Sequence, residues 1–269
     1  MKTTFIKIIR TILWLTFASM IIISIFIISY SNYTQHQSTK TFSELSKSIN
    51  STNNPTIIKE PTNTPNINSN INNNTNNQIL NKYSALYEQN SDLYGWIKIS
   101  DTPIDFPVMY SPDEPQFYLR KDFYKNYSLI GTPFIITPST QNTIIYGHNM
   151  QNDSMFSSLS KYKDKEYWQE HKYIQFDTLY SESTYEIFIV TNSIVYYSDD
   201  SIPEDAYLFY EHTNFDTIND FDEYISHAKD AEFFDSEISA NYQDSLITLC
   251  TCDYNAQNSR LLVIAKKIS

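Results

Sequence analysis

The chain has 269 residues, enough for one large domain or two small ones. Its 31 acidic and 19 basic side chains give a formal charge of −12 at pH 7, which disfavours nucleic acid as a partner because phosphates require Lys and Arg. Its two cysteines, Cys250 and Cys252, lie too close along one strand to suit a disulfide, so a disulfide framework is excluded and a functional thiol is not.

The amino-terminal end predicts a membrane anchor. Residues 1–10 contain Lys2, Lys7 and Arg10, and residues 11–30 are uncharged and mostly apolar. A membrane-spanning helix needs about 20 such residues, whereas a cleaved signal has an apolar core of about 7–15. The weak cleavage-site match at residues 29–31 is therefore the less favoured alternative. Because flanking basic residues stay inside the cell, we expect a single pass through the cell membrane, with residues 1–10 cytoplasmic and the bulk extracellular.

Residues 31–77 predict a flexible tether. Asn, Thr, Ser and Pro dominate this segment, and seven of the ten residues 68–77 are asparagine. So little apolar surface cannot offset the entropy lost on ordering the chain. The alternative for the short stretch Phe42-Ser43-Glu44-Leu45 is an extension of the membrane helix or an isolated turn. We therefore place the start of the folded extracellular domain at residue 78 and its end at residue 269.

From residue 78 the pattern predicts one amphipathic helix followed by many short strands. Apolar residues recur at helical spacing over residues 79–87, and a helical cover is expected over residues 155–168. A further helix should begin at Thr217, because Asp220 follows three residues later as in a capping box. Strands are expected at residues 96–99, 104–109, 133–136, 143–146, 173–176, 185–190, 194–197, 245–252 and 261–265. Many short strands with few helices favour a closed or nearly closed β-barrel.

The last two predicted strands carry the candidate chemistry. A short loop between them would place Cys252 at the end of one strand and Arg260 at the start of the next. A thiol is a nucleophile as its thiolate, which a nearby cation or imidazolium favours. His148, which follows Gly147 at the end of another predicted strand, is the candidate imidazole. These residues alone indicate a Cys/His/Arg hydrolase or transferase.

Structural interpretations compete with these assignments. A lone cysteine is more often a small buried hydrophobe, and Arg260 could simply pair with an acid such as Asp253. Cys250 should share a strand face with Cys252 at about 7 Å along the strand and is interpreted as a bystander. No histidines, carboxylates or thiols fall at a convincing metal spacing, so we predict no metal site and no cofactor. The histidines without a catalytic setting are His36, His171, His212 and His227.

Three separated segments resemble the sortase family, the transpeptidases of Gram-positive cell surfaces. Thr248-Leu249-Cys250-Thr251-Cys252 resembles the Thr-Leu-x-Thr-Cys signature of that family. The segment Ile145-Tyr146-Gly147-His148-Asn149-Met150, followed by Met155-Phe156, is similar to the histidine region of class B sortases. Gly95-Trp96-Ile97 and Pro107-Val108 also sit where class B members carry such residues. The resemblance covers roughly residues 78–269.

This resemblance implies a mostly β fold: a closed eight-stranded sortase barrel with amino-terminal helices and an extra helix between strands six and seven. It implies Cys252 as nucleophile, His148 as acid and base, and Arg260 as oxyanion donor. The implied reaction cleaves a carboxyl-terminal sorting motif of exported proteins after threonine and transfers the acyl group, through a thioacyl-enzyme, to a peptidoglycan or pilin amine. The implied partners are therefore sorting-motif proteins, that amine, and the membrane through residues 11–30.

Two other functions compete with this interpretation. L,D-transpeptidases are also exported and use Cys, His and Arg, but they carry Ser-His-Gly-Cys at the thiol, where this chain has Cys250-Thr251-Cys252. A catalytically inert surface adhesion module with a sortase-like shell is the non-enzymatic alternative. It does not explain why all three catalytic residue types are present.

Overall fold

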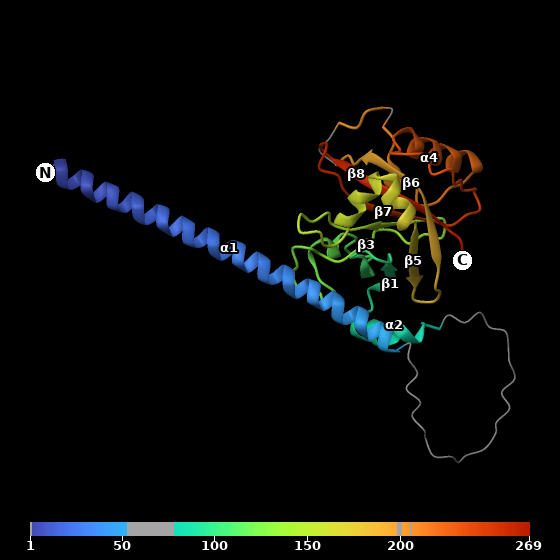
Figure 1. The fold of residues 1–269 in the computed structure, drawn as a ribbon, viewed down its shortest axis with the longest axis horizontal. Coiled ribbons are helices and arrows are strands. Elements are labelled where there is room, and N and C mark those ends of the chain that lie inside the picture. Colours follow the sequence, from blue (N-terminus) through green and yellow to red (C-terminus); the bar gives the residue numbers. More distant parts are fainter. Residues whose placement is uncertain (1, 53–77, 198–200, 205) are drawn as a thin grey trace, which may run out of the picture.

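The computed structural model describes residues 2–52, 78–197, 201–204 and 206–269, and its centre is a closed β-barrel (Figure 1). The strands pair around the barrel in the order β1-β2-β3-β4-β7-β8-β6-β5. Their bounds are β1 Leu93–Lys98, β2 Asp105–Tyr110, β3 Phe134–Ile135, β4 Asn142–Tyr146, β5 Tyr173–Thr178, β6 Thr184–Ile194, β7 Leu246–Cys252 and β8 Ser259–Lys267. The expected eight-stranded, mostly β barrel is confirmed.

The pairing of β4 with β7 decides where the chemistry lies. These two strands are parallel, as are β2 and β3, whereas the other neighbouring strands are antiparallel. Ile247 and Leu249 of β7 point into the barrel core, and Leu246 and Cys250 join a second apolar cluster on the outer face. Because parallel strands run in the same direction, the carboxyl ends of β4 and β7 meet at one edge of the barrel.

Short helices cover the barrel. They are α2 Asn81–Gln89, α3 Lys165–Glu170 and α4 Ile218–Asp230, with 3₁₀ segments η1 Phe117–Arg120, η2 Ser157–Lys163 and η3 Phe209–Glu211. Helix α4 begins with the predicted capping box, in which the Thr217 hydroxyl accepts from the Asp220 amide and the Asp220 carboxylate accepts from the Thr217 amide. Its Phe221 and Tyr224 pack in the outer cluster, so α4 is the extra helix expected between the sixth and seventh strands.

The predicted tether is wrong over residues 31–52. Helix α1 Lys2–Thr52 continues through this part, and its Phe42, Leu45 and Ile49 are buried against the domain. These side chains form one helical stripe, and the Phe42 ring meets the Phe106 ring of β2 edge-on at 5.2 Å between centroids. A tertiary contact therefore orders a segment whose composition alone favours disorder. Residues 53–77 of the predicted tether lie outside the described residues.

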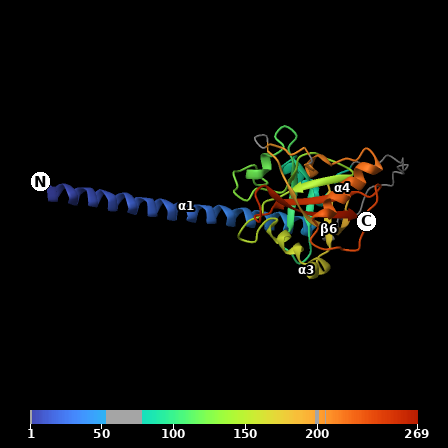
Figure 2. The same cartoon turned by 90° about the horizontal axis from the view of Figure 1, so that it is seen from above.

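The amino-terminal part of α1 differs from the docked part. It projects away from the domain as a straight rod (Figures 1 and 2). Its apolar side chains are exposed, including Leu13, Trp14 and Phe26. By length and composition this helix is apolar enough to cross a membrane.

One predicted strand does not form. Residues 194–197 were expected to be a separate strand, but β6 is continuous from Thr184 to Ile194 and ends there. It pairs with β8 over this whole length, from Tyr185 with Lys267 to Ile194 with Ser259. The chain leaves the sheet after Ile194, so that Tyr196 and Tyr197 become available to line the cavity described below.

Candidate active site

The parallel pairing of β4 with β7 brings His148 and Cys252 to the same edge of the barrel. Tyr146 lies opposite Cys250, and the next amide, of Gly147, still donates to the Cys250 carbonyl at 3.1 Å. Beyond that point the pairing is continued by side chains. The Thr251 hydroxyl donates to the Gly147 carbonyl at 2.8 Å, so the two strand ends are held together immediately before both candidate residues.

Gly147 is required by packing. A Cβ at this position would lie 2.6 Å from the ring of Phe156, which is fully buried behind the His148 loop. The following residue, Asn149, donates its side-chain amide to the Cys252 carbonyl at 2.8 Å. The His148 loop is thus fixed to the barrel on one side and to the end of β7 on the other.

The antiparallel pairing of β7 with β8 places Arg260 directly opposite Cys252. The guanidinium donates to the Ser259 carbonyl at 2.9 Å and to the Tyr197 hydroxyl at 2.5 Å. Asp253, the acid considered above as its partner, instead pairs with Lys163 at 2.9 Å. The predicted juxtaposition of a thiol and a guanidinium is therefore present, and the competing ion pair is not.

A cavity of about 570 Å³ opens at this edge, and His148, Cys252 and Arg260 all line it. Its walls are largely apolar and aromatic. They include Phe134, Ile136, Ile144, Tyr146, Val195, Tyr196, Tyr197 and Tyr210. A cavity with apolar and aromatic walls and a few convergent polar groups can hold a ligand beside the thiol.

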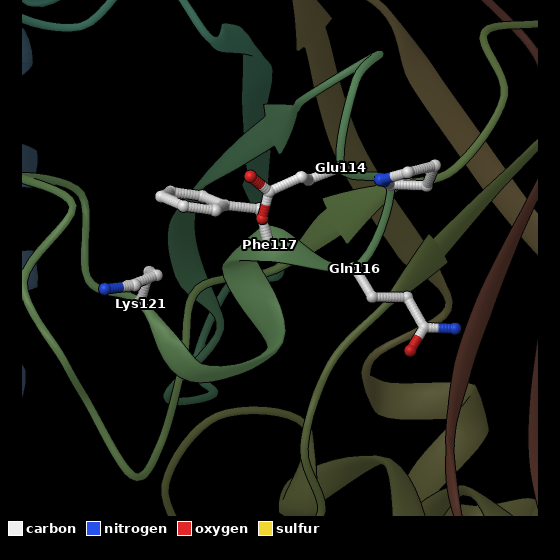
Figure 3. Close-up of a pocket in the computed structure, with 5 residues that line it drawn as sticks. Glu114, Gln116, Phe117 and Lys121 are labelled. Atoms are coloured by element: carbon white, nitrogen blue, oxygen red, sulfur yellow. The ribbon is translucent and has the colours of Figure 1, made fainter.

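A second, open depression adjoins the cavity at η1. It is lined by Glu114, Pro115, Gln116, Phe117 and Lys121, and Gln116 also lines the cavity (Figure 3). In the close-up the Gln116 side chain points away from those of Phe117 and Lys121. Gln116 thus forms part of the boundary between the two hollows.

The protonation of His148 follows from its surroundings. Its Nε2 lies 2.8 Å from the Leu119 carbonyl. A carbonyl only accepts, so Nε2 carries the proton and Nδ1 is left as the base. Burial lowers the pKa of His148, the hydrogen bond to Leu119 opposes this, and the charge of Arg120 lowers it further. The resting imidazole is therefore neutral and able to accept a proton.

The two cysteines differ although they share a strand face. Both line the cavity, as expected from their spacing, but Cys250 is buried in the outer cluster while Cys252 is partly exposed. Burial raises the pKa of the Cys250 thiol to about 12, and the charge of Arg260 offsets only part of this. Cys250 is therefore held as a neutral thiol.

The remaining histidines lie elsewhere. His171 stacks on Tyr167 at 4.2 Å between ring centroids. His212 and His227 stack on Tyr207, at 4.5 and 4.0 Å. His36 lies on α1. Among the described residues no group of three His, Cys, Asp or Glu side chains could hold a metal ion.

Sequence reasoning missed the supporting groups. Tyr197, Asn149 and the Leu119 carbonyl each contact a candidate residue, yet they come from three segments that are far apart in the sequence. Lys163, which binds Asp253, lies 90 positions before it. No spacing rule connects such residues, and only Asn149 could have been suspected, because it follows His148 directly.

Comparisons with known proteins point to one family. A family model described as the sortase domain matches residues 97–268. Sortase B of Listeria monocytogenes is 31% identical over 193 residues, covering 68% of this chain and 73% of that protein. The X-ray structure of Clostridium perfringens sortase B is 30% identical with a TM-score of 0.58, covering 69% of this chain and 98% of that one. A sortase B–substrate complex of Staphylococcus aureus is 26% identical with a TM-score of 0.61, covering 72% and 87%.

Proposed function

This chain belongs to the sortase family as a class B cysteine transpeptidase, and on that premise we propose that Cys252 is its nucleophile, His148 its acid and base, and Arg260 its oxyanion donor. One observation carries this assignment. Arg260 lies directly opposite Cys252 across β7 and β8, and His148 lines the same cavity from the end of β4.

In the first half-reaction the Cys252 sulfur attacks a peptide carbonyl carbon, and its proton passes to Nδ1 of His148. The new C–S bond turns the carbonyl oxygen into an oxyanion. The Arg260 guanidinium remains charged at any relevant pH and donates to that oxygen. When the C–N bond breaks, the His148 imidazolium gives its proton to the leaving amine. A thioacyl-enzyme and a free carboxyl-terminal fragment remain.

The second half-reaction reverses these roles. An acceptor amine attacks the thioacyl carbon, and neutral His148 takes the proton that the amine loses. The C–S bond then breaks, the proton returns to the departing Cys252 sulfur, and a new amide bond has formed. A neutral resting imidazole suits both steps, because each begins with proton acceptance.

The substrates follow from the family. We infer that the donor is an exported protein with a carboxyl-terminal sorting motif cleaved after threonine, and that the acceptor is an amine of peptidoglycan or of a pilin. The Staphylococcus aureus relative has been solved as a substrate complex, which supports a peptide donor. We further infer that α1 anchors the protein in the cell membrane, with residues 1–10 cytoplasmic and the barrel outside.

Trapping the intermediate tests this function. Purified full-length protein is mixed with a pool of sorting-motif peptides without an acceptor amine, and its intact mass is measured. We expect one acyl adduct that maps to Cys252, together with release of the carboxyl-terminal peptide fragment. A chain that gains no adduct, although a thiol reagent still modifies Cys252, would instead be the inert shell considered above.

A further inference from the structure

The edge of the barrel where β4 and β7 end, which we call the catalytic edge, lies on the same side of the domain as the amino-terminal part of α1. In both overall views the β7–β8 loop and the loop after β4 lie on the side of the domain toward the amino-terminal end of α1, and the carboxyl terminus lies on the other side (Figures 1 and 2). Side chains connect the two. Asn152, in the loop that follows His148, donates its amide to the Gln35 side chain of α1 at 3.2 Å.

A second contact joins α1 to the chain segment that also holds His148. The Ser38 hydroxyl of α1 and the Ser128 hydroxyl share a buried hydrogen bond of 3.0 Å. Ser128 belongs to the chain segment that begins at Leu119, whose carbonyl holds His148. The same segment therefore touches α1 at one end and the catalytic histidine at the other.

These contacts determine how far the catalytic edge lies from residue 30, the end of the apolar segment 11–30, along the axis of α1. Gln35 and Ser38 are five and eight residues beyond residue 30. A helix rises 1.5 Å per residue, so the contacts lie about 8 and 12 Å along the axis from that point. The headgroup region extends about 5–8 Å beyond the hydrocarbon core on each side of a bilayer. The Gln35 contact therefore lies at the outer boundary of the headgroup region and the Ser38 contact about 4 Å beyond it, and any tilt of α1 brings both contacts closer to the membrane.

The loop formed by residues 120–128 is suited to such a surface. It carries Arg120, Lys121 and Lys125 against a single acid, Asp122, whereas the part of the chain from residue 31 onward has a formal charge of −15. Tyr124 and Tyr127 are 49% and 62% exposed. Tyrosines concentrate at membrane interfaces, and basic side chains are attracted to anionic headgroups. Lys125 also pairs with Asp92 at 2.8 Å, which leaves Arg120 and Lys121 as the main positive charges.

We propose that the 120–128 loop rests on the lipid headgroups of the outer membrane surface, so that the catalytic cavity opens beside the membrane. This inference rests on the proposed anchoring by α1. Docking of Phe42, Leu45 and Ile49 makes the barrel and the helix one body, so the orientation does not depend on a flexible link. Such a site favours peptides and amines that are themselves held at the membrane surface.

Spin-label relaxation in vesicles tests the orientation. Full-length protein with Cys252→Ala, which leaves the buried Cys250 thiol, is reconstituted into vesicles of equal parts phosphatidylglycerol and phosphatidylcholine. A nitroxide is attached at Tyr127→Cys or, as the matched control, at Tyr180→Cys in the exposed β5–β6 turn. Adding a nickel-chelating lipid should more than double the relaxation rate at position 127 and leave that at position 180 unchanged.

The outcomes separate the two proposals. Protein that does not float with the vesicles refutes the anchoring by α1, and the orientation falls with it. Protein that floats but shows equal relaxation at both positions refutes the orientation alone.

A seven-residue helical insertion after Tyr30 moves the domain about 10 Å away from the membrane and leaves its rotation about the helix axis nearly unchanged. This insertion should abolish the effect at position 127 while turnover of a soluble peptide by the matching Cys252 enzyme stays the same. If the relaxation at position 127 survives the insertion, the loop does not contact the membrane.

Discussion

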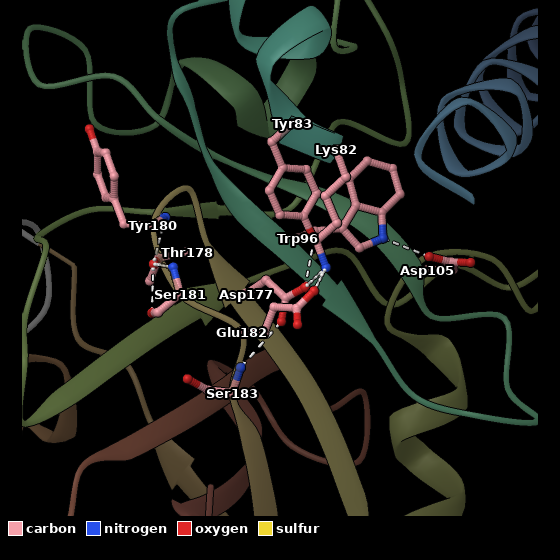
Figure 4. A network of polar contacts seen from close by, with 10 residues as sticks. All are labelled: Lys82, Tyr83, Trp96, Asp105, Asp177, Thr178, Tyr180, Ser181, Glu182 and Ser183. Atoms are coloured by element: carbon pink, nitrogen blue, oxygen red, sulfur yellow. Dashed lines mark hydrogen bonds and ion pairs between the residues drawn. The ribbon is translucent and has the colours of Figure 1, made fainter. Parts of the chain in front are cut away.

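Charged groups are arranged differently on two opposite sides of the barrel. Strands β1 and β7 are four positions apart in a closed ring of eight, so they face each other across it. On the β1 side, Lys82 of α2 lies between Asp177, at 2.7 Å, and Glu182 (Figure 4). Asp105 accepts there from the Trp96 indole at 2.6 Å and from Lys98 at 3.2 Å. Each of these charged groups has an oppositely charged partner, with Lys82 shared by two carboxylates.

On the β7 side the charges of the described residues are arranged differently. Within the part of the chain that the structure describes, no carboxylate lies within ion-pair distance of Arg260. The acid next to the nucleophile, Asp253, is held away by Lys163. Burial alone would raise the Asp253 pKa, but the hydrogen bond from Lys163, a backbone amide and the lysine charge together lower it. Ion pairs join α2 to the barrel on the β1 side, whereas the Arg260 guanidinium has no carboxylate partner among the described residues.

The largest expected effect is at the thiol. Cys252→Ala should abolish transpeptidation, because the other thiol that lines the cavity, Cys250, is buried and held neutral. The measurement is release of the carboxyl-terminal fragment from a sorting peptide, followed by chromatography. Any turnover above the uncatalysed rate by this variant would show that the nucleophile has been assigned to the wrong residue.

Arg260→Lys should cause the second-largest loss of turnover. A lysine keeps the charge, but its ammonium cannot reproduce the planar fork of the guanidinium. Loss of one oxyanion donor lowers turnover by about 10²–10³. The matched control is Arg120→Lys, at an exposed arginine that does not line the cavity and whose charge lysine keeps, and it should stay within a few-fold of the parent. Steady-state kinetics on folded protein decide the matter, and a mild effect of Arg260→Lys would make Arg260 a structural charge like those on the β1 side.

Lys82→Met should lower the stability of the β1 side without changing turnover. It leaves Asp177 and Glu182 without their cation, and an unpaired buried or half-buried charge costs about 1–3 kcal/mol of unfolding free energy. Turnover at a temperature where the protein is folded should not change. Urea denaturation gives the stability, with Lys267→Met at the exposed end of β8 as control. A loss of turnover without a loss of stability would mean that the two sides of the barrel are functionally coupled.

Much of the barrel could be predicted because its strands are local patterns. The alternation and β-branched runs around Ile144 and Ile247 specify strands, and the Thr217–Asp220 spacing specifies a helix start. The relation of Cys252 to Arg260 was also readable, because a short loop leaves two strands little choice of pairing. The position of His148 depends on the parallel pairing of β4 with β7, which the local pattern did not predict; the family resemblance implied the role of His148 but not that pairing.

The rest depends on contacts between distant residues. Residues 31–52 have the composition of a linker, and only the burial of Phe42, Leu45 and Ile49 against the barrel orders them. The ion pair of Asp253 with Lys163 and the hydrogen bond from Arg260 to Tyr197 also join segments that are far apart in the sequence. Contacts of this kind produce no periodic pattern in a single sequence. Composition therefore predicts disorder for residues 31–52, and proximity in the sequence suggests Asp253 as the partner of Arg260.

The smallest expected effect is at the neighbouring thiol, Cys250. Cys250→Ser buries a hydroxyl where a weakly polar thiol packed, which costs about 1–3 kcal/mol if the hydroxyl finds no partner. Cys250→Ala avoids that cost and tests the chemistry alone. Because burial raises the Cys250 pKa to about 12, the thiol is not ionised near neutral pH and contributes no negative charge beside Cys252. Turnover per folded molecule should therefore stay within a few-fold of the parent for both variants, measured at several pH values between 6 and 9. A tenfold loss shared by both variants, with the fold intact, would show that Cys250 takes part in the reaction and that the buried thiol is not the bystander its surroundings indicate.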